Sequence, residues 1–293
     1  MKIRYASKNF RASSLDTIER ANEIIAEYLA QGFVLTLRQI YYQMVARALL
    51  PNEQKAYKRL GATLVNARLA GLTDWGAIED RTRVLRELAH WQNPRHVLEA
   101  VVEQYRIAKW EDQPYQPQVW IEKDALVGVI QPVCDDLDVP YFSCRGYSSL
   151  SAMWRAGMRA RRSDDRAPST VIFHLSDHDP SGLDMTRDIR ERLELFCGYA
   201  DVRRIALTLP QIERYAPPPN PAKLSDSRAP AYVRRYGYDS WELDALEPAF
   251  IAELIEEHVL SVRDEDLWKK ALAVEQEHIA VLESAAANAD TDL

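Results

Sequence analysis

The stretch Ser169–Met185, STVIFHLSDHDPSGLDM, changes its pattern near the middle. Its first seven residues form a short, strongly apolar β run of the kind that is buried inside a sheet. From Pro180 onward the pattern is helical. A buried strand that leads through a few polar residues into a helix is the repeating unit of α/β proteins, so this stretch predicts an α/β fold.

The same alternation continues on both sides of this stretch. Further β runs are QVWIE (118–122), PYFSCRG (140–146) and VRRIALTL (202–209), and helical patterns cover 124–138, 148–162 and 180–196. Strands and helices that alternate through short connections predict a parallel sheet with helices on both faces. In such sheets the chemistry lies at the carboxyl ends of the strands.

The N-terminal part of the chain has a different pattern. Helical spacing of apolar residues predicts helices over about 14–31, 36–50 and 53–70, a turn-rich stretch over 71–83 that could form a wing, and a helix over 83–109. Two helices joined by a tight turn are typical of a helix-turn-helix unit. Because Pro114 and Pro117 mark a boundary, we predict a helical domain over 1–112. An α/β domain with a C-terminal helical extension is predicted over 113–293.

Composition and charge favour a soluble globular protein. Hydrophobic residues make up 47 % and charged residues 28 % of the 293 positions. The absence of a long apolar run, of a secretory signal and of paired cysteines leads us to expect a cytoplasmic protein and no membrane. The net charge of −7 argues against a nucleic-acid partner, but residues 1–115 carry 17 Lys and Arg against 13 Asp and Glu. The front part could therefore meet phosphates while the acidic back part holds cations.

Three carboxylates follow predicted strands. Glu122 ends one strand, and Asp177 and Asp179 follow another with the spacing that places them on one side of an extended chain. Carboxylates that converge at one sheet edge need a cation between them, and oxygen ligands suit Mg²⁺ or Mn²⁺. The alternative is that the two aspartates only cap the helix that begins near Pro180. We expect a metal site.

Two adjacent tyrosines lie in the predicted helix TLRQIYYQMVARALL (36–50). The apolar stripe of this helix includes Tyr41 and leaves Tyr42 on an open face. Arg38 lies one turn before Tyr42 on the same face. A free phenol is a poor nucleophile near neutral pH, and a neighbouring guanidinium favours the phenolate and can grip a phosphate. The alternative is an exposed tyrosine that stacks on an arginine stem.

These motifs together resemble a known family. The order of Glu122, Gly146 in CRGYSSL and the Asp177-x-Asp179 pair is similar to the Toprim domain of topoisomerases and primases. A narrower resemblance is to the A subunit of topoisomerase VI and the related meiotic double-strand-break transesterase, and it rests on the motifs EKDA, RGY and SDHDPSGLDM. The short chain resembles the stand-alone A-like members of that family. In that family a winged-helix domain with an Arg-x-x-Tyr-Tyr motif precedes the Toprim domain, and here that motif is Arg38–Tyr42.

The resemblance implies a DNA-cleaving transesterase. Tyr42 would attack a phosphodiester of double-stranded DNA, helped by Arg38, with Mg²⁺ (or Mn²⁺) on the three carboxylates. It also implies a homodimer, in which the tyrosine and the metal site come from different protomers, and a nucleoid-associated location. Because the sequence contains no phosphate-binding G-x-x-x-x-G-K-[ST] loop, a separate ATPase subunit of the B type would be needed as a partner. The alternatives are a Toprim nuclease that uses water and a DNA-binding module with a structural Mg²⁺ site.

Several basic residues are candidate DNA contacts. They are Lys55, Lys58 and Arg59 in the third helix, Lys123 beside Glu122, and Lys223 and Arg228 in the Pro-rich loop 216–230. For the third helix taken alone, a solvated face is the simpler interpretation. Glu242 could form a capping pair with Asp239. A second metal ligand at Glu242 or Asp244 is the less favoured alternative.

Overall fold

The computed structural model describes residues 1–79, 88–161 and 169–289. Its centre is a four-stranded sheet in the order β4-β3-β5-β6, and every neighbouring pair is parallel. The strands are β3 (Tyr115–Ile121), β4 (Tyr141–Ser143), β5 (Ser169–Leu175) and β6 (Asp201–Ala206). The predicted α/β class with a parallel sheet is therefore confirmed.

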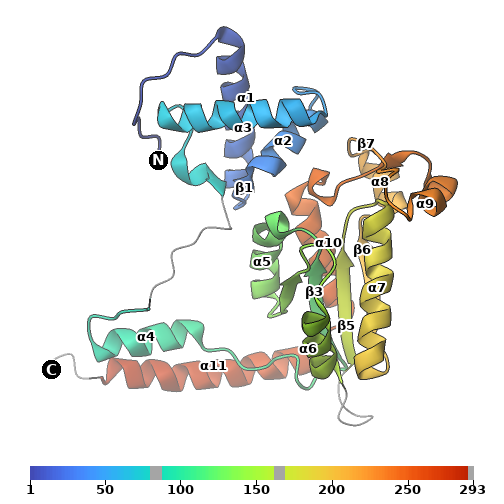
Figure 1. Cartoon of the computed structure of the whole chain (residues 1–293). Coiled ribbons are helices and arrows are strands. Elements are labelled where there is room, and N and C mark those ends of the chain that lie inside the picture. The colour runs from blue at the N-terminus through green and yellow to red at the C-terminus, as the bar shows by residue number, and fades with distance from the viewer. Residues whose placement is uncertain (80–87, 162–168, 290–293) are drawn as a thin grey trace.

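Helices cover both faces of this sheet (Figure 1). The helices α5 (Val127–Asp136) and α10 (Pro248–Leu260) lie on one face, and α6 (Leu150–Ala160) and α7 (Pro180–Cys197) lie on the other. Because side chains alternate along a strand, Phe173 belongs to one buried cluster and its neighbour Ile172 to the other.

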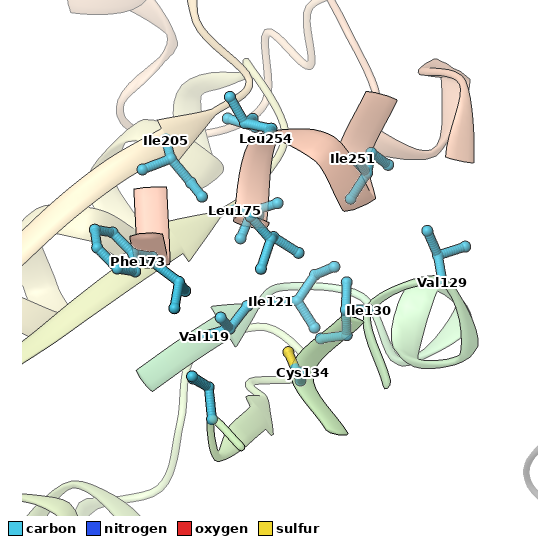
Figure 2. Close-up of a cluster of buried hydrophobic side chains, with 14 of the residues drawn as sticks. Val119, Ile121, Val129, Ile130, Cys134, Phe173, Leu175, Ile205, Ile251 and Leu254 are labelled. Carbon is cyan, nitrogen blue, oxygen red and sulfur yellow. The ribbon is translucent and has the colours of Figure 1, made fainter. Parts of the chain in front are cut away.

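The larger of these two clusters lies between the sheet, α5 and α10. Figure 2 shows Val119 and Ile121 of β3 and Phe173 of β5 pointing toward side chains of both helices, among them Ile130 and Ile251. All five side chains are fully buried. This core holds the strand ends in fixed positions, and the strand ends carry the candidate site.

A second core belongs to the N-terminal helices. These are α1 (Ala12–Ala30), α2 (Leu37–Ala46) and α3 (Gln54–Leu69), with a short parallel pair of β1 (Leu35–Thr36) and β2 (Ile78–Glu79) beside them. Thr36 begins α2 with a capping box in which it exchanges hydrogen bonds with Gln39. The three predicted helices thus form, within two residues of the expected ends for α1 and α3.

Away from both cores, α4 (Pro94–Gln104) packs along α11 (Glu265–Ala287), as Figure 1 shows. The helix predicted over 83–109 is shorter than expected, and residues 80–87 at its start and at the end of the predicted wing lie outside the described residues. The buried Lys109 ammonium joins the turn after α4 to α11 through Glu275, at 2.8 Å.

The remaining elements are short. They are α8 (Leu209–Tyr215), β7 (Asn220–Pro221), α9 (Ala229–Tyr236), β8 (Asp239–Ser240) and the 3₁₀ turns η1 (Trp75–Ala77), η2 (Asp124–Leu126) and η3 (Leu243–Ala245). We call residues 219–247 the cover segment, because its two ends contact the N-terminal helices and its middle part packs on the loop after β5. Asn52 donates hydrogen bonds to Pro219 and Asn220, and Tyr28 bonds to Glu247. Over the described ranges, no helix combines the length and apolar character that crossing a bilayer requires.

Candidate functional site

The two tyrosines of α2 are both buried. Tyr41 is 4 % exposed and Tyr42 is 5 % exposed, and their rings meet edge to face. The predicted open face for Tyr42 is therefore wrong. The cover segment closes that face, since Ala245 packs into the N-terminal core and the Asn220 side chain lies beside the phenol of Tyr42. The prediction that Tyr41 belongs to the core is confirmed.

Arg38 joins Tyr42 to the cover segment. Its Nη2 donates to the Tyr42 phenol oxygen at 3.3 Å and to Glu242 Oε2 at 2.9 Å. Its Nε donates to Asp244 Oδ2 at 2.5 Å. The predicted contact between Arg38 and Tyr42 is thus present. The expected capping pair of Asp239 with Glu242 does not form, because Asp239 lies in β8 while Glu242 pairs with cations.

Lys123 approaches the same carboxylates from the sheet. Its ammonium lies 2.9 Å from Asp177 and 3.1 Å from Asp244, and it also pairs with Glu242. Nearby carboxylates raise the pKa of Lys123 although burial acts in the opposite direction. Residues of the N-terminal helices and of the sheet edge therefore meet at Glu242 and Asp244 within one chain.

The three predicted metal ligands lie at the carboxyl ends of neighbouring strands. Ile121 pairs with Leu175 in the sheet, so Glu122 and Asp177 follow at the same edge. The Asp177 backbone N–H donates to Glu122 at 3.0 Å, and the Asp177 carboxylate accepts from the Leu243 N–H at 2.7 Å. Asp179 instead caps α7 by accepting from the Gly182 N–H at 2.6 Å. The capping alternative thus describes the contacts that Asp179 makes.

The charges at this edge are unbalanced. Burial raises the pKa of Glu122, and the Asp177 N–H and Lys123 oppose that increase without cancelling it. Burial also raises the pKa of Asp177, with Lys123 acting in the opposite direction. A divalent cation would reduce the repulsion between these carboxylates, and the all-oxygen donor set has the chemistry that Mg²⁺ prefers. Glu122 and Asp177 therefore fit such an ion chemically, although no group of three metal-binding side chains is already assembled among the residues the structure describes.

The Tyr42 phenol is not activated in this arrangement. Burial raises its pKa to about 12, and the nearby Glu242 carboxylate adds to that increase. Arg38 lowers the pKa, as expected from the sequence, but it is outweighed. Neighbouring carboxylates occupy the guanidinium, which reduces its influence on the phenol.

Arg204 holds the loop after β5 in place through hydrogen bonds to its backbone. Its guanidinium donates to the carbonyl oxygens of Ser176, Asp177 and Leu207 at 3.0, 2.7 and 3.1 Å. It also donates to the Gly182 carbonyl at 2.9 Å. Burial lowers its pKa to about 10. Arg204 therefore fixes the backbone that carries Asp177.

The other candidate DNA contacts are spread over the surface. Lys55, Lys58 and Arg59 are exposed on α3, and Lys223 is exposed in the cover segment. Arg228 pairs with Asp226 at 2.6 Å and with Asp184 at 3.1 Å, so neighbouring acids neutralise much of its charge. Of the six predicted DNA-binding residues, only Lys123 shares carboxylate partners with Arg38 at the site.

Sequence reasoning gave too little weight to the cover segment. Glu242 and Asp244 are two residues apart in the sequence, as are Asp177 and Asp179, and that repeated spacing was the available signal. In the structure Glu242 precedes the turn η3 and Asp244 lies within it. Asn220 and Arg204 had no such signal. Their roles depend on where the chain returns in space.

The fold and the site together define an α/β protein with an N-terminal helical part and a mixed basic and acidic site at the carboxyl edge of its parallel sheet. None of the protein-family models searched matches the chain, and none of the curated proteins does either.

Proposed function

We propose that the protein is a DNA-cleaving transesterase similar to the topoisomerase VI A subunit, with Tyr42 as nucleophile. The N-terminal helices would act as a winged-helix domain and the sheet as a Toprim domain. The observation that carries the proposal is the chain of contacts from the Tyr42 phenol through Arg38 to the carboxylates at the sheet edge. These contacts connect a nucleophile, a phosphate-binding cation and an acidic site.

In the proposed reaction, the Tyr42 oxygen forms a bond to the phosphorus of a DNA phosphodiester. The bond from phosphorus to the 3′ oxygen breaks, the 5′ end stays on the tyrosine, and the 3′ oxygen takes up a proton. The phenol first gives its proton to solvent. Arg38 orients the phosphate by donating to its oxygens, as a guanidinium does well.

Mg²⁺ or Mn²⁺, when bound, would supply positive charge to the phosphate oxygens. Glu122 and Asp177 would hold the ion, and Asp179 could join through the lone pairs that its helix cap leaves free. Lys123 keeps the Asp177 side chain in place by its 2.9 Å ion pair.

The substrate would be double-stranded DNA, cut on both strands by a homodimer. The exposed Lys55, Lys58 and Arg59 of α3 lie on the same N-terminal unit as Tyr42 and could contact the backbone. A separate ATPase subunit would be needed for strand passage, and a nucleoid location would follow from the substrate.

A test uses supercoiled DNA with Mg²⁺ or Mn²⁺, detergent denaturation and detection of protein-linked DNA ends. Tyr42→Phe should abolish the covalent adduct, because it removes only the attacking oxygen. Tyr41→Phe is the matched control. It removes a neighbouring buried phenol that bonds to Pro51 and Glu53, and it should cost about 1 kcal/mol of stability while leaving the adduct.

The second candidate is a metal-dependent nuclease that uses water as its nucleophile. The burial of Tyr42 and its raised pKa favour this alternative. If Tyr42→Phe still cuts DNA and no adduct appears, the nuclease is correct. If wild-type protein binds DNA but never cuts it, the protein is a DNA-binding module.

A further inference from the structure

One oxygen of Glu242 lies between two cations that belong to different parts of the fold. Glu242 Oε2 accepts from Arg38 Nη2 at 2.9 Å and from the Lys123 ammonium. Arg38 comes from α2, and Lys123 follows β3. An oxygen held by a guanidinium and an ammonium has the surroundings of a phosphate oxygen in a binding site.

This oxygen is also next to the phenol. The same Arg38 nitrogen, Nη2, donates to Tyr42 Oη at 3.3 Å and to Glu242 Oε2. Any anion that replaced the Glu242 carboxylate would therefore lie beside the Tyr42 oxygen.

We propose that Arg38 and Lys123 form a binding site for a phosphate-type anion, and that Glu242 occupies it in the free protein as an internal substitute. A phosphodiester displaces the Glu242 carboxylate when it enters. Identifying the anion as a DNA phosphodiester rests on the proposed function. The anion site itself rests on the contacts above.

Glu242 and Asp244 differ in side-chain exposure, and this difference fits the displacement of Glu242 by a phosphodiester. The Asp244 side chain is fully buried and contacts both cations, whereas the Glu242 side chain is 26 % exposed. Glu242 can swing toward solvent while Asp244 still holds Arg38 and Lys123 in place. A phosphodiester carries one negative charge, so it would restore the charge that Glu242 takes away.

In the free protein Glu242 forms ion pairs with both cations. The free protein thus fills its own cationic site with a carboxylate, and Tyr42 stays covered beside it.

The test measures binding of a short fluorescent DNA duplex by anisotropy, in EDTA so that no cleavage occurs. Glu242→Gln keeps the size and removes the competing charge, and it should tighten binding about threefold to tenfold at low ionic strength. Asp239→Asn is the matched control, because it removes one charge from an exposed residue of the same segment. It should change affinity less than about twofold.

Two further variants keep the test decisive. Glu242→Asp retains the charge with a shorter reach and should give an intermediate affinity. Arg38→Ala in the Glu242→Gln background should remove the gain, because the gain depends on the freed guanidinium. Thermal unfolding of each variant checks that it is folded.

Calorimetry with inorganic pyrophosphate separates this inference from the proposed function. Pyrophosphate binding by Glu242→Gln that depends on Arg38 supports the anion site, even if the protein never binds DNA. Equal DNA affinity of Glu242→Gln and Asp239→Asn, with no gain in pyrophosphate binding, overturns the anion site. The cleavage proposal survives that result if the Tyr42 adduct forms.

Discussion

Arg204 is a partly buried cation whose hydrogen-bond partners are mainly carbonyl oxygens. It holds the backbone at Ser176, Asp177 and Gly182 and so fixes the turn between β5 and α7. Gly182 belongs to the same packing, since a Cβ there would lie 2.2 Å from the Asp177 carbonyl oxygen. The position of the Asp177 carboxylate thus depends on a residue that touches no substrate in the proposed reaction.

Replacement of Arg204 by Met should therefore destabilise the protein strongly. The change removes the donor to the Asp177 and Leu207 carbonyl oxygens, whereas the Ser176 carbonyl keeps the Leu207 N–H and the Gly182 carbonyl keeps the Ser176 hydroxyl. We expect a loss of about 3 kcal/mol in the free energy of unfolding. Urea unfolding followed by circular dichroism measures it.

Arg203 is the matched control for this change. Its side chain is 40 % exposed and pairs with Asp201 at the surface. Arg203→Met should cost less than about 1 kcal/mol. Equal losses for the two variants would show that Arg204 has no special role in the turn.

At the scale of single elements, a buried ion pair joins the segment after α4 to α11. Lys109 and Glu275 are both nearly inaccessible, and Glu275 also accepts the Ile107 backbone N–H at 2.9 Å. Glu275→Ala should cost about 3 kcal/mol, the lower end for breaking a buried pair, because Asp138 still contacts Lys109 at 3.2 Å. Thermal unfolding provides the measurement. Glu277→Ala, at an exposed position of the same helix, should be nearly neutral.

The helices and strands with strong periodicity could be predicted from the sequence. The capping box at Thr36, the strand β5 and the start of α7 at Pro180 all follow from local residue patterns. The short elements α8 and α9 were missed, because few residues define their pattern. The pairing of α4 with α11 could not be predicted either, since it joins segments that are far apart in the chain.

The candidate site was predictable only in part for the same reason. Glu122 and Asp177 meet because parallel strands end at one edge, and Arg38 meets Tyr42 because helical residues four apart are neighbours. The burial of Tyr42 depends on Asn220 and Ala245, which return to α2 from the far end of the chain. No local pattern around Tyr42 contains that information.

At the scale of the whole molecule, the cover segment joins the N-terminal helices to the sheet. Arg38 and Lys123 meet its carboxylates within one chain. The family resemblance implied instead that tyrosine and metal site come from different protomers. The contacts within the chain favour a site in which Tyr42 works with the carboxylates of its own chain.

A mixing experiment distinguishes the two arrangements. Tyr42→Phe and Asp177→Asn each remove one part of the proposed site, and the two variants are co-expressed with different tags so that mixed assemblies can be isolated. If each site lies within one chain, every chain in a mixed assembly lacks a required part, and no DNA adduct forms. If sites are shared between protomers, a mixed dimer contains one intact site and one doubly damaged site, and it cuts one strand. Adduct formation by the mixture would therefore contradict the one-chain site. It would also mean that the contacts of Arg38 with the cover segment must be broken before the protein can act, because the same residues cannot serve both arrangements at once.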